Sequence, residues 1–557
     1  MIRKTLSLAL ALLFATSTFA AAETTQKGTF VAIGGGQETP EILQTLLRCV
    51  GGPDRRVVVM PLASDDPAGS GEAYKQFFAS AGIPNVESMV LADRDAAQQI
   101  GPVKDIGNAD MLYFTGGDQT RLANLLANTA VDGAIQAAWR RQAVIAGTSA
   151  GAMVWGPEFI ANGTSQGALK FGFSRDSRGV PGLDLRPGLD LWDHLIIDTR
   201  FTDQERLGRL LLAVASTPGS TGLGIDEGTA AVITPETIQV VGSGSVTVLE
   251  SDQISGNNAQ FVGPGTPLGV GNVVLHRLIP GMTYLRKKRR VEEALPLGPA
   301  TALPPVAPMI ALAGSDVPRP SMTSMRDFIR ASGGTEARLL MLTGDMASKA
   351  ADRWRAFLLK SGAEQVVNYQ AIELSDQGLA IALQHATGIL LLEDDQASLL
   401  HALNAHEDRF RNVLLEACTR MPVAAAGNAV RIVGARALFG TPGQPDYQSL
   451  PGLGLLPSAI LVKNFWTPAS MDRMVRAQLE ASRSLAIGLS PDNSLTLSGG
   501  QASVSGESQV IFLDANHATA LHLAPDDSNH LSGAGNLELS VVPPGGSYDL
   551  MHHQATF

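Results

Sequence analysis

The sequence predicts an α/β protein with two tandem domains, each built on a mostly parallel sheet flanked by helices and ending in a small β element. Its 557 residues exceed what one hydrophobic core usually organises. Short apolar runs such as 57–60 and 111–114 alternate with helix-like stretches such as 120–128. This alternation is typical of parallel strands buried on both faces. Segments of the first half also recur, in order, in the second half.

The first 22 residues are expected to form a signal peptide. Arg3 and Lys4 precede an apolar run from Leu6 to Phe14, and small residues follow as far as Ala22. Such a run is too short to span a bilayer, and the small residues fit a cleavage site. No later segment reaches the roughly 18 uncharged apolar residues of a membrane helix. The mature protein is therefore expected to be periplasmic or secreted and free of the membrane.

The repeat divides the remaining chain. Phe30–Gly36 resembles 309–315, and Leu112–Gln119 resembles 389–396, where an apolar run again ends in Asp-Gln. The segments around Ser149 and Asn428 correspond at nearly the same spacing, which indicates duplication. The copies are expected at 28–290 and 308–557, with a Pro-rich linker at 291–307 between them. A Val-, Thr- and Ser-rich tail in each copy, 230–250 and 495–514, is expected to be antiparallel, and an intramolecular pseudo-dimer of the copies is one possible arrangement.

Charge and cysteine content exclude several functions. The formal net charge is −11, and the one dense basic run, 286–290, is interpreted as a solvated domain edge, so no nucleic-acid partner is expected. Cys49 and Cys418 lie in separate apolar, helix-like segments, which favours two buried thiols over a disulfide or metal site. No metal or other cofactor is expected.

A nucleophile elbow is the strongest chemical signal. Gly147-Thr-Ser-Ala-Gly151 follows the apolar run 143–146 and precedes a helix-like start at Ala152. Glycines around a serine on a sharp strand-to-helix turn expose the hydroxyl, and amides at the helix N-terminus can stabilise an oxyanion. Ordinary turns also use Gly and Ser, so the motif alone is weak. Its position between a strand and a helix favours a catalytic serine, or descent from one, at Ser149.

Four segments, taken in order, resemble the cyanophycinase branch of the dipeptidase E-type serine peptidases: 116–119, 147–152, 198–210 and 224–227. The resemblance extends over roughly 30–285. The resemblance implies a class I glutamine amidotransferase-like fold and an exopeptidase that releases β-aspartyl-arginine dipeptides from cyanophycin or a related polymer. It makes Ser149 the nucleophile and Glu227 the acid that orients a histidine. The implied substrate-binding residues are Gln119, Asp198, Thr199, Arg200 and Arg206, and the implied oxyanion residues are Gly117 and Ala150.

The sequence departs from the family at the catalytic base. The family has a histidine before the phenylalanine, whereas this chain has Thr199-Arg200-Phe201. Arginine stays protonated and cannot take the proton of a serine. His194 and His276 are interpreted as structural, and Lys170 remains open as a substitute base. Three hypotheses follow: an exported serine exopeptidase, a pseudoenzyme that binds such peptides, or an interaction protein that uses its second copy.

The second copy is expected to lack the chemistry altogether. Sequence matching sets Asn428 against Ser149, Phe465 against Arg200, and Pro491 against Glu227. Gln396 is the one matching site residue that survives. A scaffold or docking role is the resulting expectation for this copy.

Overall fold

In the computed structural model, the described residues are 28–173, 182–292, 305–344, 348–373, 375–393, 397–405, 409–440, 448–463, 465, 470–480, 485–523 and 532–557. The expected signal peptide, most of the expected linker and Gln396 lie outside these ranges. Within them no helix is both long enough and apolar enough to cross a membrane. No cluster of three or more His, Cys, Asp or Glu side chains suited to a metal ion occurs there either.

The first half is built on a nine-stranded sheet whose centre is parallel and whose one side is antiparallel. Its strand order is β16 (Arg290–Val291), β15 (Thr283–Leu285), β11 (Thr237–Gly242), β10 (Thr229–Ile233), β1 (Phe30–Ile33), β5 (Val144–Thr148), β4 (Met111–Phe114), β2 (Val57–Met60) and β3 (Val86–Ser88). The parallel core confirms the predicted α/β class. The antiparallel tail is also present, but β10 and β11 extend the main sheet rather than forming a separate element.

Helices cover both faces of this sheet. Alternate residues of β1 point to opposite sides, so Val31 and Ile33 pack in one core cluster and Phe30 and Ala32 in the other. The first cluster lies under α1 and α2, and the second under α3, α4 and α5. The helices of this half are α1 (Pro40–Val50), α2 (Pro67–Ser80), α3 (Ile100–Gly107), α4 (Gln119–Leu126), α5 (Ala130–Arg140), α6 (Ala150–Met153), α7 (Ser165–Phe171) and α8 (Leu207–Ser216).

A second nine-stranded sheet has the same strand order. It runs β32 (Gln554–Thr556), β31 (Ser547–Asp549), β27 (Gln501–Gly506), β26 (Asn493–Ser498), β17 (Met309–Ala313), β21 (Val423–Gly427), β20 (Gly388–Glu393), β18 (Arg338–Thr343) and β19 (Gln365–Gln370). Its helices are α9 (Thr323–Ala331), α10 (Ser348–Lys360), α11 (Asp376–His385), α12 (Ser398–Ala405), α13 (Arg409–Cys418), α14 (Val430–Val433) and α15 (Ser470–Glu480). The order therefore repeats strand for strand between the halves.

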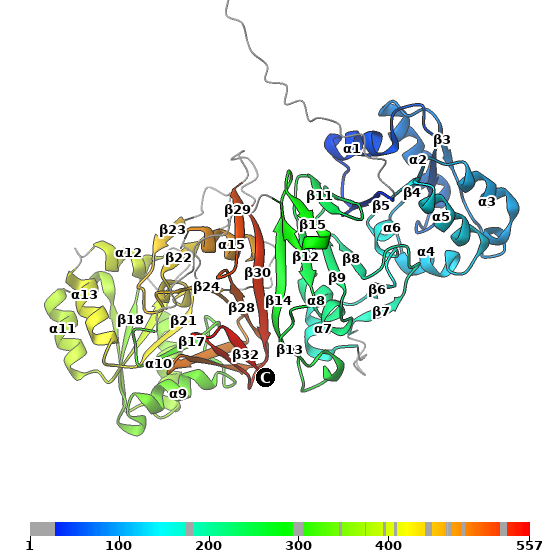
Figure 1. Cartoon of the computed structure of the whole chain (residues 1–557). Helices are drawn as coiled ribbons and strands as arrows, with labels where there is room; N and C mark the ends of the chain where they lie inside the picture. The colour runs from blue at the N-terminus through cyan, green and yellow to red at the C-terminus, as the bar shows by residue number, and fades with distance from the viewer. Residues whose placement is uncertain are drawn as a thin grey trace, which may run out of the picture.

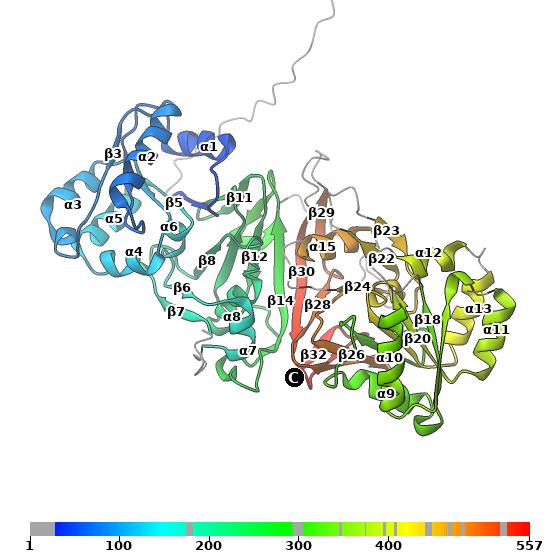
Figure 2. The same cartoon turned by 180° about the vertical axis from the view of Figure 1, so that it is seen from behind.

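A third sheet joins the two halves, and Figures 1 and 2 show it between them with β14 beside β30. Its main path is β24 (Ala459–Lys463), β25 (Leu485–Leu489), β28 (Val510–Asp514), β30 (Ser532–Val542), β14 (Val270–Leu278), β12 (Val246–Glu250), β9 (Thr221–Ile225) and β8 (Leu195–Thr199). The order is symmetric about the antiparallel β14–β30 pair, with a parallel pair at each end. One hydrophobic core contains residues of α8, α15, β14 and β30, so the halves share buried surface.

One buried ion pair also crosses between the halves. Arg277 on β14 has only 1% of its side chain exposed, and its Nη2 lies 2.7 Å from Asp472 Oδ1 on α15. Burial raises the pKa of Asp472, which the nearby Arg277 guanidinium opposes. A buried charge without its partner is costly, so this pair ties α15 to β14.

Candidate functional site

The elbow predicted from the sequence has the expected strand–turn–helix geometry. Ser149 lies between β5 and α6 with φ 52° and ψ −123°, a backbone conformation that non-glycine residues rarely adopt. A Cβ on Gly147 would lie 2.2 Å from the Gly151 carbonyl oxygen, and one on Gly151 would lie 2.3 Å from that of Phe114. Only glycine fits at either position, which explains the motif around the serine.

Ser149 opens into a cavity of about 350 Å³ at the ends of β1, β4, β5 and β8. Thirteen residues line it: Gly35, Gly36, Tyr74, Gly116, Gly117, Gln119, Thr148, Ser149, Ala150, Met153, Thr199, Arg200 and Arg206. Seven of the nine residues predicted for the site are among them. The two others, Asp198 and Glu227, do not line it, but each contacts an arginine that does.

Two backbone amides suit an oxyanion. Gly117 has φ 143°, and a Cβ there would lie 2.0 Å from the carbonyl oxygen of Ala63, so the turn requires glycine. Ala150 begins α6, and the first amides of a helix have no partner within it. Among the described residues no hydrogen-bond acceptor is found for the N–H of Gly117 or of Ala150. Both amides belong to the same cavity as Ser149 and are free to bind a ligand oxygen.

Arg200 stands where the resemblance implies a histidine. Its Nε lies 3.2 Å from Glu227 Oε1, so the guanidinium is paired with the predicted orienting acid. A Cβ placed on Gly35 would lie 3.2 Å from Ser149 Cβ and 3.3 Å from Arg200 Nε, which brings serine, arginine and acid together around one glycine turn. A protonated guanidinium at this position has no lone pair with which to accept a proton from a serine.

No residue in the cavity wall replaces this base. Of the thirteen described lining residues none is His, Lys, Asp or Glu. The Tyr74 hydroxyl donates to Glu38 Oε1 at 2.8 Å, and burial raises its pKa, so it is a poor proton acceptor at neutral pH. Lys170, the substitute left open by the sequence, instead lies 3.5 Å from Asp492.

The two histidines considered from the sequence lie elsewhere in the fold. His276 is fully buried on β14, and its Nδ1 accepts a hydrogen bond from the Asn536 amide at 3.0 Å. His194 precedes β8, at the end of the strand opposite to Thr199 and Arg200. Neither lines the cavity.

Asp198, predicted to contact substrate, does not line the cavity in this structure. Its side chain is fully buried, with one oxygen accepting from Arg206 Nη1 at 3.0 Å and the carboxylate bound twice by Arg209, at 2.5 and 2.7 Å. Arg209 was missed from the sequence, although Arg206 and Arg209 are three residues apart around one face of α8's first turn. Asp198 is a positioning residue for Arg206.

Gln119 and Arg206 line the cavity and are held in place by neighbouring groups. The Gln119 amide donates to the carbonyl oxygens of Ile160 and Ala161, at 3.2 and 2.8 Å. Arg206 donates to the carbonyl oxygen of Thr199 at 2.8 Å, and burial lowers its pKa while Asp198 opposes that shift. An amide and a guanidinium held this way present polar groups to a ligand at low entropic cost.

We expect Asp198→Ala to lower the free energy of unfolding by about 3–5 kcal/mol, because it leaves two arginines buried without their shared carboxylate. Urea denaturation of the purified chain measures this loss. Lys287→Ala is the control, since its pair with Glu236 spans 3.7 Å on the surface and should contribute less than about 1 kcal/mol. Equal losses in the two variants would contradict the positioning role of Asp198.

In the second half the corresponding site is filled. Ala313 of β17 takes the place that Ile33 of β1 has in the first sheet, because Ile33 pairs with Thr148 and Ala313 pairs with Ala426. On the other side these two residues pair with Ala230 and Ser494. The residue after Thr148 is Ser149 and the residue after Ala426 is Gly427, so Gly427 is the counterpart of Ser149. Gly427 shares the unusual conformation, with φ 59°. The sequence-based pairing of Ser149 with Asn428 was therefore wrong by one residue.

The pairing of Arg200 with Phe465 was also wrong by one residue. Phe465 packs on Gly488 as Phe201 packs on Gly224, so these two phenylalanines correspond. Lys463, 5% exposed, places its Nζ 2.6 Å from both carboxylate oxygens of Asp316 and 3.1 Å from Asn428 Oδ1. With glycine at the serine position and an ion pair beside it, this half has no nucleophile of the Ser149 kind.

A serine on a glycine-flanked elbow, two free amides and a nearby acid at the edge of an α/β sheet are features that fit a peptidase site. The model of peptidase family S51 matches residues 30–241. A cyanophycinase from Synechococcus elongatus is 32% identical over 278 residues, which are 49% of this chain and 84% of that protein. The chain belongs to peptidase family S51.

A second cyanophycinase agrees with this membership. A cyanophycinase from Nostoc sp. is 34% identical over 274 residues, covering 48% of this chain and 89% of that protein. Among solved structures, a peptidase from an acI-B1 Actinobacterium is 20% identical with a TM-score of 0.36, over 47% of this chain and 97% of that one.

Proposed function

We propose that the Ser149 cavity binds an aspartyl/arginyl peptide of the cyanophycin type and hydrolyses it poorly, because Arg200 occupies the position of the base. The observation that carries this proposal is the 3.2 Å contact of Arg200 Nε with Glu227 Oε1 beside Ser149. The cyanophycinase relatives supply the substrate class. Gln119, Arg206 and the amides of Gly117 and Ala150 would bind the peptide.

The chemistry of acyl transfer sets the expected activity. Attack by a serine hydroxyl on a carbonyl needs a group that takes the hydroxyl proton and returns it to the leaving amine. Arg200 is protonated and can do neither. Enzymes that lose one member of such a triad keep a residual acceleration of about 10³–10⁴ over water, from the oxyanion hole and binding alone. A slow hydrolase with an intact binding site is the expected phenotype.

The second candidate is an active serine exopeptidase that uses Ser149 as its nucleophile. The strained elbow and the two free amides favour it, because both features serve acyl transfer rather than simple binding. It requires a base other than the residues that line the described cavity.

Two measurements on the full chain separate these candidates. Binding is measured by co-sedimentation with cyanophycin granules, and serine reactivity by covalent labelling with a fluorophosphonate. The proposal predicts binding together with labelling far slower than that of a family member with the base histidine. Rapid dipeptide release that Ser149→Ala abolishes would establish the active enzyme instead, and a lack of binding would exclude both.

We infer further that the second half is a degenerate duplicate and that the two halves mimic a homodimer. The identical strand orders of the two nine-stranded sheets and the symmetric path of the shared sheet support this inference. Export to the periplasm or the medium is proposed from the N-terminal sequence, and a polymer held outside the cell would be the corresponding ligand.

A further inference from the structure

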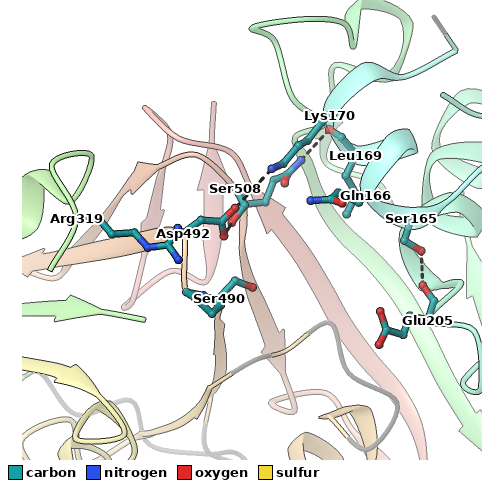
Figure 3. A pocket seen from close by; sticks show the side chains of 11 residues that line it. Ser165, Gln166, Leu169, Lys170, Glu205, Arg319, Ser490, Asp492 and Ser508 are labelled. Atoms are coloured by element: carbon teal, nitrogen blue, oxygen red, sulfur yellow. Dashed lines mark hydrogen bonds and ion pairs between the residues drawn. The ribbon is translucent and has the colours of Figure 1, made fainter. Parts of the chain in front are cut away.

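A cavity of about 470 Å³ lies between the two halves, beside the loop that carries Arg206. The first half contributes α7 and Glu205, and the second contributes Arg319 and the turn from Ser490 to Asp492. Figure 3 shows Arg319 entering from one side and Glu205 from the other, with Ser490 and Asp492 between them. The cavity therefore exists only because the two halves are joined.

Contacts across the joint fix the walls of this cavity. Lys170 Nζ of α7 lies 3.5 Å from Asp492 Oδ2, and each side chain is about one quarter exposed. Ser508 donates to Asp492 Oδ1 at 2.5 Å, and Gln509 donates to the Leu169 carbonyl oxygen at 2.8 Å. The contacts of Asp492 with Lys170 and of Gln509 with Leu169 hold α7 against the second half, and Ser508 fixes the Asp492 carboxylate. The cavity is therefore a built feature rather than a gap between loosely placed parts.

Two charges face the cavity without a counter-ion. Neither the Glu205 carboxylate nor the Arg319 guanidinium has an ion pair or a side-chain hydrogen bond within the described ranges. Unpaired charges of opposite sign on facing walls suit a ligand that carries both a cation and an anion. A peptide segment with a guanidinium for Glu205 and a carboxylate for Arg319 has that chemistry.

The same loop connects this cavity to the serine. Glu205 has φ 53°, and Ser165 Oγ donates to its carbonyl oxygen, which fixes the turn before α8. The next residue, Arg206, lines the Ser149 cavity. Because consecutive Cα atoms are about 3.8 Å apart, the two cavities are separated by little more than this loop. One extended peptide could contact both.

The turn of the second half that lines this cavity corresponds to the turn that carries Glu227 in the first half. Ser490, Pro491 and Asp492 follow β25 as Asp226, Glu227 and Gly228 follow β9, since Leu489 and Ile225 end these strands at matching positions. The turn that carries the acid Glu227 in the first half thus carries Pro491 in the second and lines the new cavity.

We propose that the cavity between the halves is a second subsite for the peptide, binding a segment with an arginine side chain at Glu205 and an aspartate carboxylate at Arg319. This proposal rests on the proposed function, because it assigns the cavity to another part of the same ligand. It gives the degenerate half a role in binding without chemistry. A ligand of one dipeptide unit fills the Ser149 cavity alone, whereas a longer chain occupies both.

The test compares a short ligand with a long one in the full chain. The probes are the β-aspartyl-arginine dipeptide and soluble cyanophycin, titrated by calorimetry against wild type, Glu205→Gln and Arg319→Gln. We expect each variant to bind the polymer about three- to tenfold more weakly and the dipeptide as wild type does. Glu416→Gln and Arg420→Gln are the matched controls, since this exposed pair lies at the end of α13 and in the turn after it and lines neither cavity.

The outcomes separate the subsite from the function on which it rests. If Glu205→Gln and Arg319→Gln bind the polymer with the same affinity as wild type, the subsite proposal is overturned and the proposed function stands. Equal weakening of dipeptide and polymer would also overturn it, because the charges would then act on the Ser149 cavity. Wild type that binds neither ligand would overturn both proposals.

Discussion

Arg200→His is expected to raise the rate of dipeptide release from cyanophycin by about 10²–10⁴-fold, the usual contribution of a general acid–base group. Arginine Nε and histidine Nε2 are the same number of bonds from Cα, so an imidazole reaches the space that the Arg200 Nε now occupies. That point lies 3.2 Å from Glu227 Oε1, and both it and Ser149 Cβ lie within 3.3 Å of the position that a Cβ on Gly35 would take. The acid needed to orient the imidazole is therefore already in place. Dipeptide release followed by chromatography, with kcat and KM determined separately, measures the gain.

The control for this gain is Arg200→Gln, which removes the charge without supplying a base. If hydrolysis rises because the charge is lost, glutamine and histidine should act alike. If it rises because a proton acceptor is restored, only histidine should act, and Ser149→Ala in the Arg200→His background should abolish the gain. The restored activity should also fall as the pH drops below the pKa of the imidazole, near 6.5 for an unperturbed histidine. A histidine variant no faster than the glutamine variant would show that more than the base is missing.

The elbow and the α/β class could be predicted because both are local in the sequence. The strand before Ser149 begins with the apolar run Val144-Ile-Ala146, and the glycines at 147 and 151 are dictated by carbonyl oxygens 2.2–2.3 Å from any added Cβ. The same holds for the alternation of strands and helices, which follows from burial on both faces of a parallel sheet. Nothing distant in the chain is needed to recognise either feature.

The position of the degenerate site was missed by one residue because a sequence match compares residue types. It aligned the polar Asn428 with Ser149, whereas the backbone requires a residue with positive φ at that point. Gly427 supplies this conformation without strain, and glycine is the residue that adopts it most readily. The strand register, which the sequence does not display, decides the pairing.

The burial of Asp198 could not be predicted for a different reason. The family resemblance assigns Asp198 to substrate binding, and the sequence cannot show that two arginines of the following turn and helix close over it. The contact between the halves could not be predicted either, because nothing in the sequence of β14 shows which strand it pairs with. Its partner lies more than 250 residues away in the chain.

The first half expressed alone, as residues 28–292, is expected to be unstable as a monomer and to dimerise. Removing the second half uncovers the backbone edge of β14 together with Val270, Val273 and Leu275, which are fully buried in the intact chain. An uncovered apolar strand edge pairs with another chain. Because the shared sheet is symmetric about β14 and β30, two copies could pair β14 with β14 in a twofold arrangement. Size-exclusion chromatography with light scattering would detect this dimer.

Arg277 provides a second test of this dimer. In the intact chain its side chain is buried against Asp472, which belongs to the second half. A dimer of first halves loses that carboxylate, and a buried charge left without its partner costs about 3–5 kcal/mol. Arg277→Met should therefore strengthen the truncated dimer, while Arg277→Met in the full chain, which strands Asp472, should lower stability. A truncated protein that stays monomeric and fully folded would show that β14 does not need a partner, and the pseudo-dimer would then be an accident of packing rather than a requirement of the fold.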